Sequence, residues 1–473
     1  MRRALGVVLV ALVLAPAANA SHPAGLFTTQ DRVVTMDDGV GIATTTYVPF
    51  EHAPHPGVFP AVMVFHGLGG NRGTVRIVAE AFARRGYVAL TFDFRGHGDS
   101  GGLFTALGPR ELADIAILRE RWLPANAPII PDRVGAWGIS LGGGAALRAA
   151  AEGTPFAALE VVETWTDLYD ALVPQGFAKT GAVFTFLRGV PAERQGPELI
   201  AVGQAVARRD DATLRAFSQS RSTRHLLARG FPPTMFFQGR RDFAFGLEQG
   251  ISAFTRLTGP KALYIGPFGH APSTFPGPDV AVVLERGIAW FDRHVARIET
   301  APAVPAVELA PDPFRGTTAR YDRLPPTRTL RWTLRGRSTI GAAGKVVRRA
   351  TLRGLQETFG APTVTVSASS RTGWSHLVAV LVARTRSGSE IVVSEGGAPT
   401  RLGTRARNVT IRMISNVTTI PAGSRLELTL AATSTAQHPG NLLYLVPVGD
   451  AARITLGKVQ LRVPVLRTPV SRP

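Results

Sequence analysis

A serine stands in a glycine-rich segment, GISLG at residues 138–142, where the pattern of residues changes from that of a strand to that of a helix. The preceding stretch, Arg133 to Trp137, is strand-like, and the stretch that follows is rich in alanine. Glycines permit a sharp turn and a close backbone approach, so the hydroxyl of Ser140 would stand clear of a sheet. We therefore predict Ser140 as a nucleophile for acyl transfer. The alternative is a glycine-rich turn with an incidental serine.

A serine hydroxyl needs a base to take its proton, and the base needs an acid to orient it. The predicted strand at 262–265 is followed by GPFGH, which ends at His270, and the predicted strand at 234–238 by GRRD, which ends at Asp242. The same ends of parallel strands share one edge of a sheet, so we expect both side chains beside Ser140. His270 is the predicted base and Asp242 the predicted orienting acid; for Asp242 the alternative role is a turn cap.

The negative oxygen that forms during acyl transfer needs two hydrogen-bond donors. The backbone N–H of Leu141, directly after the nucleophile, is one predicted donor. The other is the N–H of Leu68 in the early loop HGLGG, which begins at His66. We predict a structural rather than a catalytic role for His66 in that loop.

A second glycine-rich segment, DFRGHGDSGG, begins at Asp93 and contains the pattern GxGxxG after a predicted strand. A dinucleotide site would need a helix to open there, but the next helical pattern begins near Pro109. We expect instead that Asp93, Arg95 and Asp99 form a hydrogen-bonded loop bordering the site.

The elements around these motifs alternate between strand and helix, which indicates a parallel α/β sheet. A hairpin is predicted ahead of it, with strands at 33–36 and 42–48 around the turn DDG. Residues of about 165–230 break the alternation and are predicted to be a helical cap over the sheet. Its apolar side chains either shape the substrate pocket or form the core of the cap: Phe177, Phe184, Phe186 and Leu187.

The pattern changes after a proline-rich stretch at 299–313, which we predict to be a linker. Beyond it, short alternating runs separated by glycine, proline, serine and threonine indicate an all-β sandwich or jelly roll at 314–473. The α/β domain would then occupy residues 21–298. A chain of 473 residues is expected to divide in this way, because single cores stop growing near about 250–300 residues.

The first 20 residues have the features of a secretory signal peptide: Arg2 and Arg3, a short apolar run, and the small-residue pattern Ala18-Asn19-Ala20. We therefore expect a secreted, extracellular protein, with an uncleaved membrane anchor as the alternative. The chain has no cysteine, which excludes thiol catalysis and cysteine-based metal sites. It also lacks the HExxH and P-loop motifs, and we expect neither a metal nor a cofactor.

The net charge of +19 lies mostly in the second part of the chain. From Ala301 onward there are 24 lysines and arginines against 8 acidic residues. Such a basic domain could contact an anionic cell-envelope polymer; the alternative is an arginine-biased genome and a solvated surface. The arginines are scattered without interleaved aromatic residues, which argues against a nucleic-acid partner.

Together the motifs HGLGGN, DFRGHGDSGG, GISLGG, QGRRD and GPFGH resemble an α/β-hydrolase. The β-rich tail is similar to that of the X-Pro dipeptidyl-peptidase and cocaine-esterase-like family (CocE/NonD, peptidase S15). The resemblance implies an α/β-hydrolase sheet with a helical cap insertion, followed by an all-β jelly-roll-like C-terminal domain. It also implies a Ser140–Asp242–His270 triad that cleaves an ester or amide.

Many members of that family place a tyrosine in the early loop, where this chain has Leu68, as ordinary esterases do. An X-Pro peptidase would also need an acidic pair for the peptide amino terminus; the sequence shows no convincing pair, and Glu160 and Glu163 are acidic residues that the pattern does not place. We therefore expect a secreted acyl esterase acting on a small-molecule ester through an acyl-enzyme. The alternatives are an X-Pro dipeptidyl-peptidase-like enzyme acting on short peptides, and an envelope-binding protein with an inactive hydrolase fold.

Overall fold

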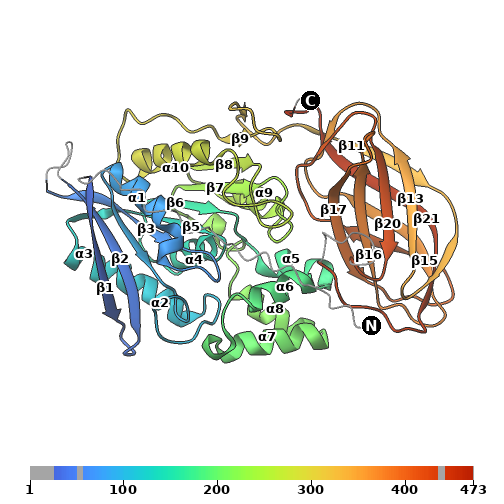
Figure 1. Ribbon diagram of the computed structural model, residues 1–473, viewed down its shortest axis with the longest axis horizontal. Helices are drawn as coiled ribbons and strands as arrows, with labels where there is room; N and C mark the ends of the chain where they lie inside the picture. The colour runs from blue at the N-terminus through green and yellow to red at the C-terminus, as the bar shows by residue number, and fades with distance from the viewer. Residues whose placement is uncertain (1–25, 51–56, 435–442, 472–473) are drawn as a thin grey trace, which may run out of the picture.

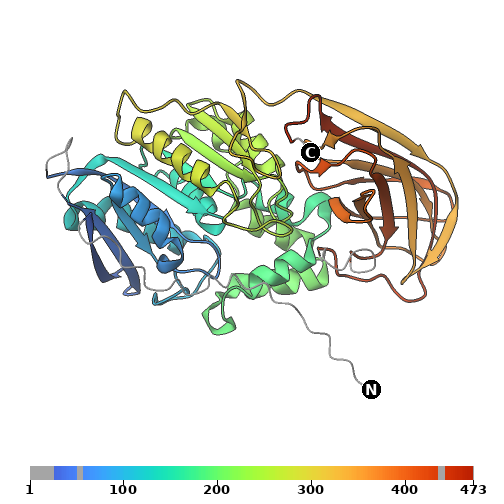
Figure 2. The ribbon, with the colours of Figure 1, turned by 45° about the horizontal axis from the view of Figure 1, so that its top comes forward.

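The computed structural model describes residues 26–50, 57–434 and 443–471, so the predicted signal peptide lies outside the described residues. A large sheet with helices on both faces is followed by a β-sandwich, and a group of cap helices (green) lies beside both (Figures 1 and 2). This is the fold class that the sequence predicts. Within the described ranges, every helix is too short or too polar to cross a bilayer.

The large sheet has ten strands in the order β1-β2-β4-β3-β5-β6-β7-β8-β9-β10. The first two strands form the predicted hairpin, and β2 pairs antiparallel with β4. From β4 across to β9 every pairing is parallel. The strands are β1 (Phe27–Thr35), β2 (Gly41–Pro49), β3 (Phe59–Phe65), β4 (Val88–Phe92), β5 (Ile129–Ile139), β6 (Leu159–Val162), β7 (Thr234–Gly239), β8 (Lys261–Gly266), β9 (Val307–Leu309) and β10 (Ala319–Tyr321).

Both faces of this sheet are covered, which explains why β3 and β7 are buried along their whole length. Alternate residues point to opposite faces: Met63 and Phe65 pack with α2, α4 and α9, whereas Val62 and Val64 pack with α1 and α10. The helices are α1 (Arg76–Arg84), α2 (Pro109–Ile117), a π-helical turn (Leu118–Trp122), α3 (Leu123–Asn126), α4 (Leu141–Ala151), α9 (Glu248–Arg256) and α10 (Val280–His294).

The segment between β6 and β7 is helical and contains no strand among its described residues, in keeping with the predicted cap. Its helices are α5 (Leu168–Leu172), α6 (Thr180–Leu187), α7 (Pro197–Arg208) and α8 (Asp211–Gln219). Strand β6 itself was not foreseen in the sequence. Its four residues, LEVV, are shorter than the runs on which strand patterns rest, and a glutamate interrupts them.

The predicted linker at 299–313 is wrong in one respect, because it contains a strand of the large sheet. Strand β9 pairs in parallel with β8, with Val307 opposite Leu263, and β10 pairs with β9 beyond the predicted boundary. Val307 and Leu309 are fully buried in the core of the sheet. A strand of three residues in a proline-rich stretch is too short to show an alternating pattern in the sequence. Burial rather than local sequence therefore makes this segment a strand.

The C-terminal strands form two packed antiparallel sheets, one with the order β11-β21-β15-β18 plus β12 on β21, the other β13-β20-β16-β17, and a separate two-stranded sheet of β14 and β19. Their inner faces share one apolar core. The strands are β11 (Thr327–Leu334), β12 (Ser338–Gly341), β13 (Lys345–Thr351), β14 (Gln356–Glu357), β15 (Thr363–Ser369), β16 (His376–Arg384), β17 (Glu390–Pro399), β18 (Arg407–Arg412), β19 (Thr419–Ile420), β20 (Arg425–Ala431) and β21 (Arg453–Leu466).

Candidate active site

Ser140 occupies a strained turn between β5 and α4. Its backbone has φ 53° and ψ −113°, a region that residues with side chains rarely adopt. The flanking glycines make the turn possible: a Cβ at Gly138 would overlap the carbonyl of Gly142, and one at Gly142 would overlap the carbonyl of Phe65. The predicted junction of strand and helix therefore exists, and it presents the serine at the carboxyl edge of the sheet.

The structure brings together the three side chains that the sequence singles out. Ser140 Oγ lies 3.0 Å from His270 Nε2, and His270 Nδ1 lies 2.7 Å from Asp242 Oδ2. The second carboxylate oxygen of Asp242 accepts the N–H groups of Ala244, at 2.9 Å, and Phe245, at 2.8 Å. The carboxylate is fully buried and has a fixed orientation toward the imidazole.

The electrostatics of His270 suit a proton acceptor. Burial alone lowers its pKa, but the charge and hydrogen bond of Asp242 outweigh that effect and raise the pKa from 6.5 to about 9. A positive imidazolium is thus stabilised where it would form. Because Nε2 faces the serine and Nδ1 faces the carboxylate, the ring can take a proton from Oγ while Asp242 holds its orientation.

A further carboxylate lies at this ring. Glu163, directly after β6, has its Oε2 3.7 Å from His270 Nδ1. The side-chain oxygen and nitrogen atoms of Glu163, Asp242 and His270 that could bind a metal ion lie within 4.8 Å of one another. Among the described residues, this cluster has the spacing of a metal site. The hydrogen bond from His270 Nδ1 to Asp242 accounts for the closeness of that pair, whereas Glu163 Oε2, at 3.7 Å, makes no hydrogen bond to the ring. A carboxylate after an apolar run was the sequence signal for it.

The two candidates for a peptide-binding acidic pair do not meet. Glu160 is buried on the α10 side of the sheet, where it accepts a hydrogen bond of 3.0 Å from Trp137 Nε1 and lies against Gly287. Glu163 instead faces His270. These two residues therefore do not form a joint site for an amino terminus: Glu160 lies on β6 and faces α10, whereas Glu163 follows the strand, has a φ of 49° and faces the imidazole.

The early loop packs directly on the nucleophile turn. A Cβ at Gly67 would lie 3.7 Å from Ser140 Cβ. Leu68 is the next residue in the chain, so the early loop brings its backbone near the serine in space. His66 is fully buried; its Nε2 accepts the N–H of Phe94 at 3.1 Å. Burial lowers the pKa of His66 to about 3, so the ring is neutral and joins two loops. Leu141, the other predicted donor, begins α4.

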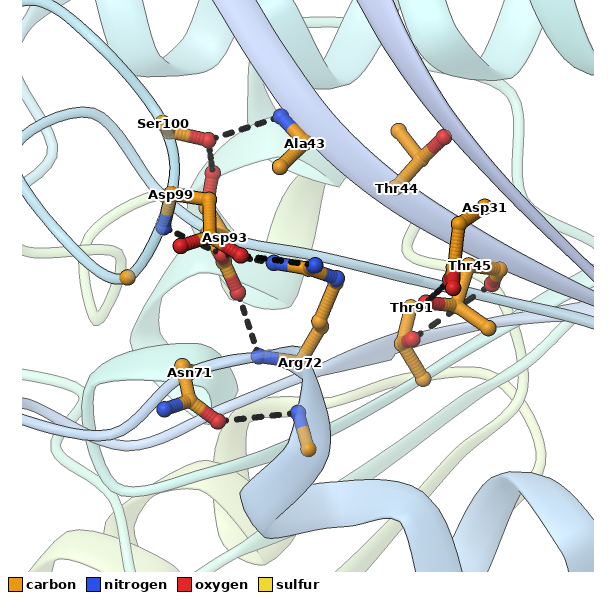
Figure 3. Close-up of polar contacts among 12 residues, drawn as sticks. Asp31, Ala43, Thr44, Thr45, Asn71, Arg72, Thr91, Asp93, Asp99 and Ser100 are labelled. Atoms are coloured by element: carbon orange, nitrogen blue, oxygen red, sulfur yellow. Dashed lines mark hydrogen bonds and ion pairs between the residues drawn. The ribbon is translucent and has the colours of Figure 1, made fainter.

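The loop that begins at Asp93 is a hydrogen-bonded structure that includes Asp93 and Asp99, as expected, together with Arg72 (Figure 3). Asp93 accepts the backbone N–H groups of Arg72 and Asp99, and the Arg72 guanidinium pairs with both carboxylates. Ser100 Oγ donates to the Asp93 carbonyl at 2.7 Å and accepts from the Ala43 N–H at 2.9 Å. Figure 3 shows the Arg72 side chain directed at Asp93.

Arg95 does not belong to that network, which corrects the prediction. Its guanidinium turns away to form ion pairs with Asp38 and Asp114. A buried arginine needs carboxylates on the side that it faces, and Asp38 of the hairpin and Asp114 of α2 supply them. These partners lie far from Arg95 in sequence and could not be inferred from the motif.

The four apolar cap residues separate into different environments. The Phe186 ring lies 6.2 Å from the His270 ring. The ring of Phe245, in the loop that carries Asp242, lies 5.1 Å from the His270 ring, so both phenylalanines place apolar surface beside His270. Phe177 stacks instead on His376 of the sandwich. Phe184 is 41% exposed, and Leu187 packs within the cap core.

The loop that carries Asp242 is anchored from three directions. Arg240, fully buried, pairs with Glu357 of β14 in the sandwich. Arg241 donates to the Val392 carbonyl of β17 at 2.9 Å. Lys179 of the cap donates to the carbonyls of Phe243, at 2.9 Å, and Ala244, at 3.1 Å. The position of the acid therefore depends on the cap and on the sandwich.

The chain was compared with known families and structures. Residues 38–272 match the family model "X-Pro dipeptidyl-peptidase (S15 family)". A CocE/NonD family hydrolase from Staphylococcus aureus superposes with a TM-score of 0.71 at 15% identity, covering 93% of this chain and 94% of that one. An alpha-amino acid ester hydrolase superposes with a TM-score of 0.67 at 15% identity, covering 97% and 100%. At these identities the superpositions establish the fold.

Curated relatives match a shorter part of the chain. The quorum-quenching protein AidA of Acinetobacter baumannii is 41% identical over 107 residues, which is 21% of this chain and 34% of AidA. An uncharacterised protein of Mycobacterium tuberculosis is 32% identical over 155 residues, which is 32% of this chain and 50% of that protein. The chain thus spans about a third to a half of the length of these relatives.

Proposed function

This chain belongs to the CocE/NonD and S15 family of α/β-hydrolases, and from that premise we propose that it is a serine hydrolase that cleaves carboxylic esters through an acyl-enzyme. The observation that carries the proposal is the continuous chain of contacts from Ser140 Oγ to His270, 3.0 Å, and from His270 to Asp242, 2.7 Å. The strained turn at Ser140 supports the same role, because such strain is typical of a nucleophile held out from its sheet.

In this mechanism Ser140 Oγ attacks the ester carbonyl carbon while His270 Nε2 takes its proton. The carbonyl oxygen becomes negative and accepts hydrogen bonds from the N–H groups of Leu68 and Leu141. As the C–O bond breaks, the imidazolium gives its proton to the leaving alcohol, leaving an acyl-serine. A water molecule then attacks the acyl carbon with His270 as base, which releases the acid and restores Ser140.

An ester is favoured over an X-Pro peptide by the surroundings of the nucleophile. Leu68 brings a hydrocarbon side chain to the early loop, and Phe186 and Phe245 add apolar surface beside His270. Glu160 is buried on the α10 face of the sheet, where it accepts a hydrogen bond from Trp137, and so it cannot bind a peptide amino terminus at this site. The family model, named for X-Pro dipeptidyl-peptidases, keeps that activity as the second candidate.

A fluorophosphonate probe tests the nucleophile. The wild-type protein is expected to be labelled, and Ser140→Ala should abolish labelling and lower turnover by about 10⁶. Ser387→Ala, in a loop of the sandwich, is the matched control and should leave both unchanged. Ester hydrolysis at the wild-type rate in Ser140→Ala would overturn the mechanism. Absence of both labelling and hydrolysis in the wild type would favour a binding protein with an inactive hydrolase fold.

A substrate panel tests the reaction class. A series of p-nitrophenyl acyl esters is compared with X-Pro p-nitroanilides under the same conditions. Turnover of the esters, with the anilides slow or inert, is the expected result. Turnover of the anilides alone would assign the protein to the peptidases.

Secretion and contact with an anionic envelope polymer complete the proposal. They rest on the signal-like residues 1–20 and on the 24 basic against 8 acidic residues from Ala301 onward. The protein should appear in the medium when residues 1–20 are present and remain in the cell when they are removed.

Binding to purified cell walls should weaken as salt is raised, because salt screens charge attraction. Retention at high salt would contradict an electrostatic contact.

A further inference from the structure

Glu163 is a buried carboxylate at the active site that the triad mechanism leaves unused. It is 2% exposed, and its Oε2 lies 3.7 Å from His270 Nδ1, the same atom that Asp242 contacts at 2.7 Å. Its other oxygen, Oε1, has no hydrogen-bond partner among the described residues. A buried carboxylate without a full set of partners is costly, so its position calls for a function.

The backbone holds Glu163 in this position under strain. Its φ is 49°, in the left-handed region, and its N–H donates to the Phe237 carbonyl of β7 at 2.8 Å. The next residue, Thr164, donates its hydroxyl to the Ser140 carbonyl at 2.8 Å. The segment is therefore fixed both to the neighbouring strand and to the nucleophile turn. Strain that the surroundings maintain is a common feature of functional sites.

We propose that Glu163 is a second acid for His270: a positioning residue that shares the imidazole with Asp242 and replaces it as ring partner when the charge of Asp242 is removed. The inference rests on the proposed function, because it assigns a role to His270 as the base. Relative to its observed place, the Glu163 carboxylate must approach Nδ1 by roughly 1 Å to make a normal hydrogen bond.

The charges around Glu163 explain how one acid would replace the other. Burial raises the pKa of Glu163 to about 8, with His270 opposing the rise and Asp242 and Asp279 adding to it. At neutral pH Glu163 is therefore mostly protonated while Asp242 holds the ring. Removing the charge of Asp242 removes one cause of the raised pKa. Glu163 then releases its proton to solvent at lower pH, and its carboxylate pairs with the imidazolium.

The remaining charged neighbour does not compete for the ring. Asp279, at the start of α10, is fully buried and accepts the Tyr264 hydroxyl at 2.7 Å. Burial raises the pKa of Asp279, and its hydrogen bond is directed at the tyrosine. Glu163 is thus the carboxylate that is both near Nδ1 and without a complete set of partners.

The experiment is a double-mutant cycle with Asp242→Asn and Glu163→Gln, measured as kcat/KM on an ester. Loss of the triad acid ordinarily costs about 10⁴. Here we expect Asp242→Asn to cost about 10²–10³ and Glu163→Gln alone less than about fivefold, with Glu163→Gln costing a further tenfold or more in the Asp242→Asn background. Besides the rise caused by deprotonation of His270, the residual activity of Asp242→Asn should show a second rise with pH as Glu163 ionises. This second rise should be absent in the double variant.

Glu160→Gln is the matched control, because Glu160 is equally buried, lies on β6 directly before the turn that carries Glu163, and bonds to Trp137. It should change kcat/KM by the same factor with and without Asp242→Asn. An equal cost of Glu163→Gln in the two backgrounds would overturn the inference.

A second measurement covers the case in which the Asp242 variants fail to fold. In Glu163→Gln alone, the rising limb of the kcat/KM–pH profile should move to lower pH, because Glu163 helps to raise the pKa of His270. A profile that superimposes on that of the wild type would count against Glu163. These outcomes differ from failure of the proposed function, in which Ser140→Ala itself would remain active.

Discussion

The proposed nucleophile, Ser140, and the proposed acid, Asp242, are held in two different ways. Ser140 stands in a turn that its neighbours Gly138 and Gly142 make possible, because they pack without side chains against backbone. The turn is joined to the adjacent strand β6 by the Ser140 N–H, which donates to the Val162 carbonyl at 2.8 Å. Asp242 stands in a loop whose anchors come from remote parts of the chain, in the cap and in the sandwich.

The acid loop shows the extent of that dependence. Arg240, two residues before Asp242, pairs with Glu357, which also accepts the N–H groups of Val470 and Ser471 near the end of the chain. Phe243, one residue after Asp242, packs with Val378 and Val380 of β16. The difference teaches that the nucleophile is encoded locally, whereas the sandwich is a structural part of the acid side of the site.

The largest loss of activity is expected when the turn that holds Ser140 is disrupted. In Gly142→Ala the new Cβ would overlap the Phe65 carbonyl, a backbone atom that cannot move freely. The turn would shift, taking Ser140 and the Leu141 N–H out of place, and we expect kcat/KM to fall by about 10³ or more.

The control is Gly403→Ala, where a Cβ would meet no atom within 4 Å among those described. It should keep wild-type activity. If Gly142→Ala also kept it, the nucleophile turn would tolerate far more displacement than its packing indicates.

Removing a contact between the sandwich and the loop that carries Asp242 should lower both the stability of the protein and its activity. Arg240→Met leaves the Glu357 carboxylate buried without its ion-pair partner, which should lower the free energy of unfolding by about 3–5 kcal/mol in urea titration. The displaced Asp242 should reduce kcat/KM by about 10- to 100-fold. The added change Glu357→Gln should restore part of the stability, because the buried charge is then absent while the amide oxygen can still accept the N–H groups of Val470 and Ser471.

Arg349→Met is the control for that variant. Arg349 pairs with Glu427 on the sandwich surface and its side chain is 58% exposed. Its loss should cost less than about 1 kcal/mol, and activity should not change. An Arg240→Met enzyme that is destabilised yet fully active would show that the sandwich supports the fold without positioning the acid.

The cap side of the site is expected to affect selectivity. Phe186→Ala would remove apolar surface beside His270 and should improve the use of longer acyl chains over short ones by about tenfold, measured across p-nitrophenyl esters. Phe184→Ala, two residues away and exposed, should leave the chain-length profile unchanged. Equal profiles in the two variants would place the acyl pocket elsewhere.

The smallest effect is a pH dependence that reports the link between base and acid. Because activity requires neutral His270 and its pKa is raised from 6.5 to about 9, kcat/KM should rise with pH with a midpoint above 6.5. Protonated His270 also stabilises the fold, fully below pH 6.5, and this contribution is lost as pH rises through about 9. A kinetic midpoint at or below 6.5 would contradict the ion pair with Asp242.

The sequence was most informative where a motif and the element beside it share a few residues. The turn around Ser140 and the loops ending at Asp242 and His270 lie where they were expected, because loops after parallel strands share one edge of the sheet. It was least informative for β6, whose four residues carry too little pattern, and Glu163 at its end was therefore not placed. The partners of Arg95 were missed for a related reason, since they come from other elements.

By itself the sequence determined the local chemistry: which serine has glycines on both sides, and which histidine and aspartate follow strands. Glycine and strand periodicity act over a few residues, so they are visible along the chain. The tertiary structure alone decided that Glu163 also lies at His270, which charges are buried together at Arg240 and Glu357, and which cap aromatic faces His270. Those outcomes depend on packing between segments that lie far apart in the chain, 117 residues for Arg240 and Glu357, where burial and charge compensation, rather than local preference, select the partners.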